Sequence, residues 1–203
     1  MNYSLFQNIN GLAGHSHAWD SFMIFIADKS PFIIIGVLFI IWLTESLTSQ
    51  NTYRQTTVLL AMITFLFGLG MNAVIHLLYW HPRPFVNHHV HQLIPHSATE
   101  SSFVSDHALL VFSISFILLQ RMPKWGYITF LFAILTGFSR IYVGVHYPAD
   151  VIGAALLAAI IGWTVLKQET RLKPFLSVIL NMYGKLLSLT PLGKKITKNT
   201  EQM

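Results

Sequence analysis

The sequence predicts an all-α protein, a polytopic membrane bundle of about five transmembrane helices with amphipathic N- and C-terminal interfacial helices. Hydrophobic residues make up 53% of the 203 residues and charged residues only 10%, whereas charged residues form about 25% of a soluble domain. Several apolar stretches also approach the roughly 20 residues that a helix needs to cross a bilayer. We expect a single membrane domain, divided into an interfacial segment 1–30, a transmembrane core 31–167 and a basic amphipathic tail 168–203.

Five apolar segments account for the predicted core. Upstream of them, apolar and polar residues alternate at helical spacing, which favours a helix lying in the interface, and Asp28 and Lys29 argue against one uninterrupted span from there. The tail combines leucines with lysines, so it is either a basic surface helix, which we prefer, or a sixth span. The predicted spans are 31–47, 56–79, 107–119, 125–142 and 149–166.

Charge predicts how the chain is oriented. The net charge is +5, but Lys and Arg lie between the spans and in the tail rather than in one patch, which argues against nucleic acid as a partner. Because the chain reverses at each span, ten of the thirteen Lys and Arg residues fall on one side, which the positive-inside bias assigns to the cytoplasm. Lys29, Arg83 and Arg140 fall on the outer side. Since Lys29 is the first Lys, we expect no cleaved signal peptide.

Polar residues that would be costly at membrane depth stand at the span ends of this outer side. Four separate stretches of sequence converge there, whereas a random scatter of histidines and arginines would use both faces. Cysteine is absent, which excludes disulfides, thiolate metal sites and a cysteine nucleophile. The converging residues are Arg83, Ser105, His107, Ser139, Arg140, His146 and Asp150.

This set supplies the groups that phosphoryl transfer requires. Two arginines can hold phosphate oxygens through paired donors, and a hydroxyl such as that of Ser105 adds another donor. One histidine can attack phosphorus while a second protonates the departing oxygen. His146 and Asp150 stand four residues apart where a helix begins, with Pro148 suited to its first turn. The carboxylate can therefore hold the second nitrogen of the ring.

The same residues resemble the signatures of the type 2 phosphatidic acid phosphatase (PAP2) superfamily. Its third signature reads Ser-Arg, five residues, His, three residues, Asp, which matches Ser139, Arg140, His146 and Asp150. Arg83-Pro84 resembles the end of the first signature, and 104–107 resembles the second. The resemblance covers roughly residues 55–167.

The sequence departs from these signatures at three positions. His76 stands where the superfamily has Lys, and a histidine carries less positive charge near neutral pH. Val104 and Asp106 replace the usual Pro and Gly. We interpret Asp106 as a carboxylate at a helix start, although it could also repel substrate or hold an arginine in place.

Within the superfamily, the segment 80–85 and the short core resemble the undecaprenyl diphosphate phosphatases of the bacitracin-resistance type. That resemblance implies hydrolysis of undecaprenyl diphosphate to the monophosphate, which recycles the carrier lipid for cell-wall synthesis, without a metal or other cofactor. It implies that His146 attacks the terminal phosphate and that His107 protonates the leaving group, with Asp150 supporting His146. It also implies a multi-pass protein of the bacterial plasma membrane whose active site faces outward. The expected phosphate-binding residues are Arg83, Ser105, Arg140, His76 and Ser139.

Several alternatives stay open. The motif residues recognise the phosphate group and not the lipid tail. Phosphatidylglycerol phosphate and phosphatidate therefore remain candidate substrates beside a polyprenyl diphosphate. A non-enzymatic lipid-phosphate carrier would use the same polar cluster, and the chain could also form a homo-oligomer in contact with membrane lipids. The loop 80–104 holds five histidines, which we interpret as a solvated loop rather than as a metal site.

Overall fold

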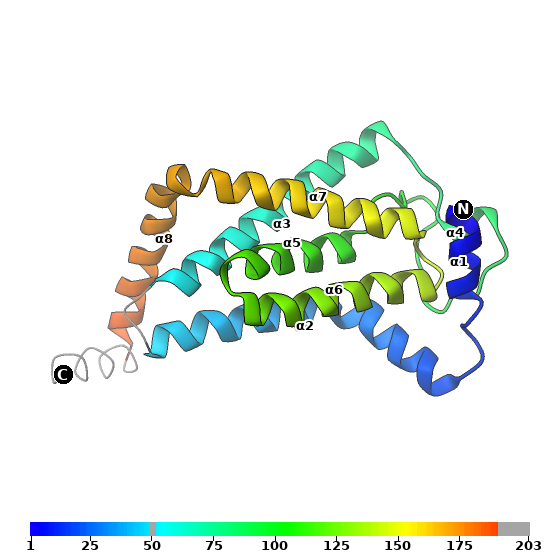
Figure 1. Ribbon diagram of the computed structural model, residues 1–203, viewed down its shortest axis with the longest axis horizontal. Coiled ribbons are helices and arrows are strands. Elements are labelled where there is room, and N and C mark those ends of the chain that lie inside the picture. The colour runs from blue at the N-terminus through cyan, green and yellow to red at the C-terminus, as the bar shows by residue number, and fades with distance from the viewer. Residues whose placement is uncertain (49–51, 191–203) are drawn as a thin grey trace.

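The computed structural model describes residues 1–48 and 52–190, which form eight helices and no strand (Figure 1). The prediction of an all-α protein is confirmed. The last lysines of the tail, beyond residue 190, lie outside the described residues. The helices are α1 (Asn2–Asn10), α2 (His17–Thr48), α3 (Tyr53–Leu78), α4 (Pro84–Asn87), α5 (Asp106–Arg121), α6 (Pro123–Tyr142), α7 (Pro148–Lys167) and α8 (Glu169–Leu189).

Helix α5 is the centre of the bundle, because α2, α3, α6 and α7 all pack against it. Its side chains from Ala108 to Ser115 are buried almost without interruption, among them Leu109, Val111 and Ile114. The outer helices instead expose large apolar side chains, such as Phe67 on α3 and Ile160 on α7. A buried centre with an apolar exterior is the arrangement expected of helices surrounded by lipid.

Three described helices are long and apolar enough to cross a membrane: the residues His17–Thr44 of α2, all of α3, and all of α7. These include the predicted spans 31–47 (as far as residue 44), 56–79 (to Leu78) and 149–166. The predicted spans 107–119 and 125–142 are also helices, α5 and α6, but neither is among the three. Helix α5 has only 16 residues, or about 24 Å at 1.5 Å per residue, and most of its side chains are buried against other helices.

The predicted break before residue 31 is wrong, because α2 runs without interruption from His17 to Thr48. Asp28 and Lys29 do not end the helix, since the two exposed side chains pair with each other at 2.7 Å. Pro31 lies inside α2 and has no N–H, so the carbonyl of Ala27 one turn earlier loses its helical donor. That carbonyl accepts a hydrogen bond from Arg140 Nη1 at 3.2 Å instead.

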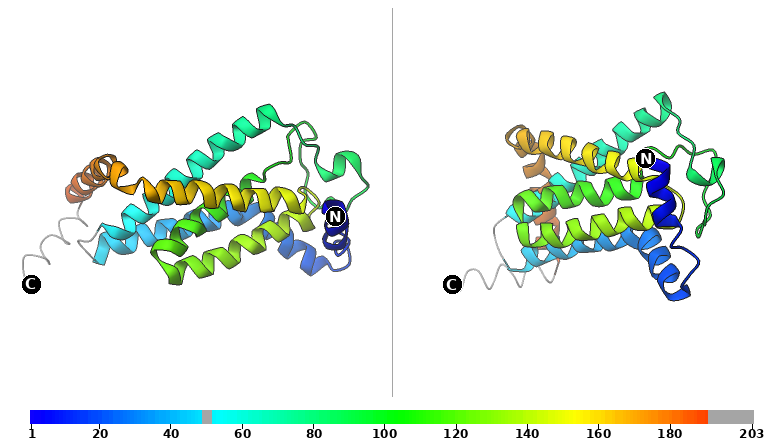
Figure 2. Two further views of the ribbon diagram at one scale, coloured as in Figure 1. Left: turned by 45° about the horizontal axis from the view of Figure 1, so that its top comes forward. Right: turned by 45° about the vertical axis from the view of Figure 1, so that its right-hand side comes forward.

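Two helices lie across the ends of the bundle. Helix α1 crosses the end at which α6 finishes and α7 begins, and α8 crosses the opposite end (Figure 2). The buried Asn10 fixes α1 by donating to the carbonyls of His91 and Tyr142, both at 2.8 Å, and by accepting from the His91 N–H at 2.9 Å. On α8, Leu176 is buried and Tyr183 packs edge-on against Trp42 of α2.

Candidate active site

The candidate active site lies at the α1 end of the bundle, around the short connection from α6 to α7. Gly144 turns the chain there with a φ of +83°, and an added Cβ would approach the His91 carbonyl oxygen to 2.7 Å. Pro148 then opens α7, and the Asp150 carboxylate accepts the N–H of Tyr147 at 2.8 Å. His146 thus lies just before α7, four residues from Asp150, with Nδ1 3.6 Å from its carboxylate.

The His146 ring has two different sides. Its Nδ1 lies 2.9 Å from the Ser102 carbonyl oxygen and 3.6 Å from Asp150 Oδ2. Both are acceptors, so Nδ1 carries the proton and Nε2 keeps its lone pair. Nε2 lies 3.3 Å from Nη1 of Arg83. Burial, aided by the positive charges of both arginines, lowers the pKa of His146 to about 3, so the ring is neutral at physiological pH and its Nε2 can act as a nucleophile.

Arg83 and Arg140 are both buried at the site. Nη1 of Arg83 donates to the Val145 carbonyl at 3.2 Å, and Nη1 of Arg140 donates to Ala27. Within residues 1–48 and 52–190, Nε of each arginine and Oγ of Ser105 are buried without a hydrogen-bond partner. Leaving three buried donors unsatisfied costs free energy, and the oxygens of a phosphate group would satisfy them.

The start of α5 carries Ser105 and His107 into the site. The Ser105 N–H donates to the Asp150 carbonyl at 3.4 Å, which ties α5 to α7. From α3, Asn72 exchanges two hydrogen bonds of 3.1 Å with the backbone of Val104 and donates to Asp106 at 2.7 Å. Asp106 is therefore a helix-start carboxylate held by Asn72. His107, in the same turn, is partly buried and lies within range of the charges of both arginines.

Two predicted phosphate-binding residues have different surroundings. His76 lines a cavity of about 300 Å³ that also includes Arg83, Glu100 and Asp106, so the structure brings His76 to the site. The Ser139 hydroxyl instead donates to the Thr136 carbonyl of its own helix at 2.7 Å. In this arrangement, Ser139 does not offer its proton to a phosphate.

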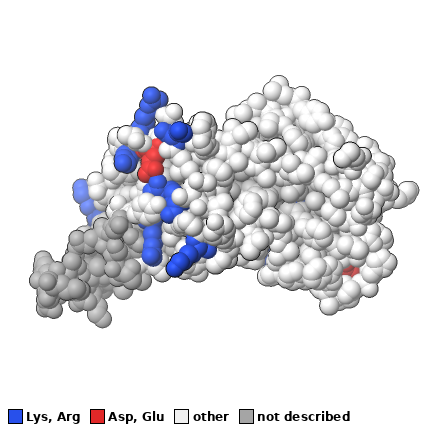
Figure 3. Space-filling view, viewed as in Figure 1, with Lys and Arg blue, Asp and Glu red and all other residues white. Residues whose placement is uncertain are grey.

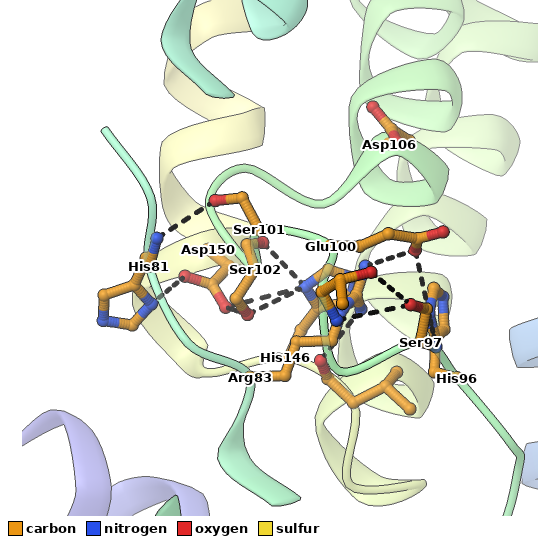
Figure 4. A network of polar contacts seen from close by, with 12 residues as sticks. His81, Arg83, His96, Ser97, Glu100, Ser101, Ser102, Asp106, His146 and Asp150 are labelled. Atoms are coloured by element: carbon orange, nitrogen blue, oxygen red, sulfur yellow. Dashed lines mark hydrogen bonds and ion pairs between the residues drawn. The ribbon is translucent and has the colours of Figure 1, made fainter. Parts of the chain in front are cut away.

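The segment before α5 holds site residues that the sequence analysis did not predict (Figure 4). The Ser102 hydroxyl donates to Asp150 Oδ2 at 2.5 Å, and His81 Nδ1 lies 4.0 Å from the other oxygen of that carboxylate. Glu100 pairs with Nη2 of Arg83 at 3.4 Å and with His96 at 3.1 Å. Only their position just before the second signature could have pointed to Glu100 and Ser102.

Two histidines of the loop 80–104, His89 and His91, are exposed, as expected of a solvated loop, but its other three histidines are partly buried. His81 and His96 are partly buried against carboxylates, and His88 stacks on Tyr3 of α1 with ring centroids 3.8 Å apart. Burial lowers the pKa of His96, and the charges of Arg83 and Arg140 act in the same direction. Among the described residues, no group of three or more His, Cys, Asp or Glu is arranged to hold a metal ion.

A buried histidine next to Arg83, with Arg140 also buried, on an all-helical scaffold with three membrane-length helices, indicates a phosphatase associated with the membrane. Comparisons with known proteins agree. Residues 55–174 match the model of the PAP2 superfamily, and the chain belongs to that superfamily. Over 188 residues the chain is 42% identical to "Undecaprenyl-diphosphatase BcrC" of Bacillus subtilis. The aligned region covers 93% of this chain and 94% of the relative.

A second sequence relative and a solved structure are similar to the chain over most of its length. The chain is 30% identical to "Bacitracin transport permease protein BcrC" of Bacillus licheniformis, over 91% of this chain and 88% of that protein. The crystal structure of Aquifex aeolicus LpxE superposes with a TM-score of 0.67 and 26% identity, over 82% of this chain and 94% of that one. The structural match extends over most of both chains, so the bundle itself is shared.

Proposed function

We propose that this phosphatase hydrolyses undecaprenyl diphosphate to undecaprenyl phosphate and inorganic phosphate. The printed name of the Bacillus subtilis relative supports this substrate, because the 42% identity extends over nearly the whole of both chains. The product would return the carrier lipid to cell-wall synthesis. The observation that carries the proposal is the His146 ring, whose Nδ1 proton is held by oxygens while its Nε2 lies 3.3 Å from a buried arginine.

The first chemical step forms a phosphohistidine. Arg83, Arg140 and Ser105 bind the oxygens of the terminal phosphate, and this binding brings phosphorus to Nε2 of His146. The Nε2 lone pair forms the N–P bond while the P–O bond to the lipid phosphate breaks. His107, as an imidazolium, gives a proton to the departing oxygen and is left neutral. The ring of His146 becomes positively charged. The Asp150 carboxylate, 3.6 Å from Nδ1, stabilises that charge, while the Ser102 carbonyl accepts the Nδ1 proton.

The second step releases phosphate. A water molecule attacks phosphorus as the N–P bond breaks, and the electron pair of that bond returns to Nε2. His107, which has lost its proton, accepts a proton from the attacking water. His146 is again neutral, and the burial that keeps its pKa near 3 favours this form of the ring.

In our proposal the chain crosses the membrane five times as one domain, through α2, α3, α5, α6 and α7, with the site at the outer face. The charge distribution supports this orientation. Figure 3 shows Lys and Arg gathered at the end of the molecule that carries α8, opposite the site. The positive-inside bias assigns such an end to the cytoplasm, where α8 would lie along the membrane surface.

Hydrolysis by the purified chain tests the proposal. In detergent, wild-type protein should release phosphate from undecaprenyl diphosphate, His146→Ala should abolish release, and His89→Ala, at an exposed histidine of the same loop, should leave it unchanged. Brief incubation with ³²P-labelled substrate should label wild-type protein with an acid-labile, base-stable phosphate. Labelling that persists in His146→Ala would contradict the assigned nucleophile.

The same assay separates the alternatives. Rates on undecaprenyl diphosphate, farnesyl diphosphate, phosphatidylglycerol phosphate and phosphatidate rank the substrates, and faster hydrolysis of either glycerolipid would overturn the proposed substrate. The name of the Bacillus licheniformis relative keeps a transport function in view. Binding of undecaprenyl diphosphate without turnover would favour the carrier over the enzyme.

A further inference from the structure

The Asp150 carboxylate uses its two oxygens differently. Oδ2 accepts from the Ser102 hydroxyl at 2.5 Å and from the Tyr147 N–H at 2.8 Å, and it faces Nδ1 of His146 at 3.6 Å. Oδ1 is buried and has no hydrogen-bond partner within the described part of the chain. A buried carboxylate with one unsatisfied oxygen is unfavourable, so a donor is needed on that side.

His81 stands on that side of the carboxylate. Its Nδ1 lies 4.0 Å from Asp150 Oδ1, and this nitrogen is likewise buried and unpaired in the portion of the chain that the structure describes. Figure 4 shows the carboxylate between the imidazoles of His81 and His146. Two unsatisfied buried atoms thus face each other, and a proton on Nδ1 would satisfy both after a shift of about 1 Å, because such hydrogen bonds measure about 2.7–2.9 Å.

Neighbouring side chains and backbone groups hold the His81 ring in place. The ring stacks on Tyr79 with centroids 5.9 Å apart and meets the edge of Tyr147 at 5.3 Å. The His81 N–H donates to Ser101 Oγ at 3.2 Å, and the His81 carbonyl accepts from the Ser102 N–H at 2.8 Å. The connection between α3 and α5 thus brings the Ser102 hydroxyl to one oxygen of Asp150 and the His81 ring close to the other.

We infer that His81 is a positioning residue for the reaction, which holds the outer oxygen of Asp150 through Nδ1–H. The inference rests on the proposed function, because the carboxylate matters most when His146 carries phosphorus and a positive charge. Fixed from both sides, the carboxylate keeps its alignment with Nδ1 of His146 as that charge develops. His81 acts through Asp150 and does not touch the substrate, so its effect falls on kcat rather than on KM.

A matched pair of amides tests this role. In His81→Asn the amide nitrogen stands where Nδ1 stood, and in His81→Gln it stands where Nε2 stood. We expect His81→Gln to lower kcat about tenfold, as for the loss of one hydrogen bond to a charged group, with KM changed less than about twofold. His81→Asn should keep kcat within about threefold of wild type. His89→Gln, at an exposed position of the same loop, should change neither value.

Each outcome is decisive. Equal kcat values for His81→Gln and wild type, with undecaprenyl diphosphate hydrolysed and His146→Ala inactive, would overturn the role of His81 and leave the proposed function intact. Equal losses in His81→Asn and His81→Gln would also overturn it, because only the position of the donor differs between them. A wild-type chain without turnover would overturn the proposed function and this inference together.

Discussion

Replacing Pro31 by Ala tests how the fold orients a phosphate-binding arginine. Pro31 leaves the Ala27 carbonyl without its helical donor, and Arg140 Nη1 takes that acceptor at 3.2 Å in a buried environment. Alanine restores the N–H and the ordinary helical hydrogen bond, which then competes with Arg140 for the carbonyl. Arg140 should therefore be held less firmly towards the phosphate.

The magnitude follows from the contact that is weakened. A hydrogen bond involving a charged group contributes about 1.5–3 kcal/mol. The carbonyl keeps a second lone pair, so we expect about half of that contribution to be lost, or about 0.8–1.5 kcal/mol, which lowers kcat/KM by about four- to twelvefold. Stability should change in the opposite direction, because proline inside a helix is about 3 kcal/mol less favourable than alanine.

The assay measures kcat/KM on undecaprenyl diphosphate and the melting temperature of the same preparation. A variant that is more stable yet less active by this factor cannot be explained by unfolding. Pro174→Ala, which removes the proline inside α8 at the opposite end of the bundle, is the control and should keep full activity. Unchanged kcat/KM in Pro31→Ala, together with a raised melting temperature, would show that the orientation of Arg140 does not depend on the Ala27 carbonyl.

Three further predictions concern charge and orientation. Because burial lowers the pKa of His146 to about 3, its ring should stay neutral from pH 5 to pH 8, and NMR spectra of labelled histidine should show no titration of this residue in that range; titration near pH 6.5 would contradict the burial. Glu100→Gln removes a negative charge from Arg83 and should tighten inhibition by inorganic phosphate about threefold, whereas weaker inhibition would mean that Glu100 orients Arg83 for binding. The chain has no cysteine, so Ala98→Cys and Lys124→Cys report their sides without background: a membrane-impermeant maleimide added to intact cells should label only Ala98→Cys, and the reverse pattern would place the site in the cytoplasm.

The sequence was sufficient to predict which polar residues lie together at one end of the bundle. His146 and Asp150 lie four positions apart where α7 begins, so the short connection into that helix keeps them close. Arg83, Ser105 and Arg140 stand at the ends of apolar segments, and each reversal of the chain returns such ends to the same face. Their roles in the reaction remain to be tested by the variants described above.

The continuous helix α2 was not predictable in the same way. In the sequence, Asp28 and Lys29 indicate the end of a membrane span, because isolated charges inside a span are unfavourable. The two side chains pair with each other and remain exposed, which removes the reason for a break. Pro31 gives the same misleading signal, since the carbonyl that it frees is satisfied by Arg140, more than a hundred residues further along the chain.

The all-helical class and the motif residues could be predicted from the sequence alone, because helical periodicity and motif spacing are local properties of the chain. The hydrogen bonds and contacts that support these residues appear first in the folded bundle. The partners of Asn72, His81 and Ser102 lie 32 to 69 positions away in the chain. Asn72 stands in the largely apolar helix α3, and the other two residues stand in a loop without a helical pattern. Such contacts depend on which segments the packed bundle brings side by side, and spacing along one chain does not contain that information.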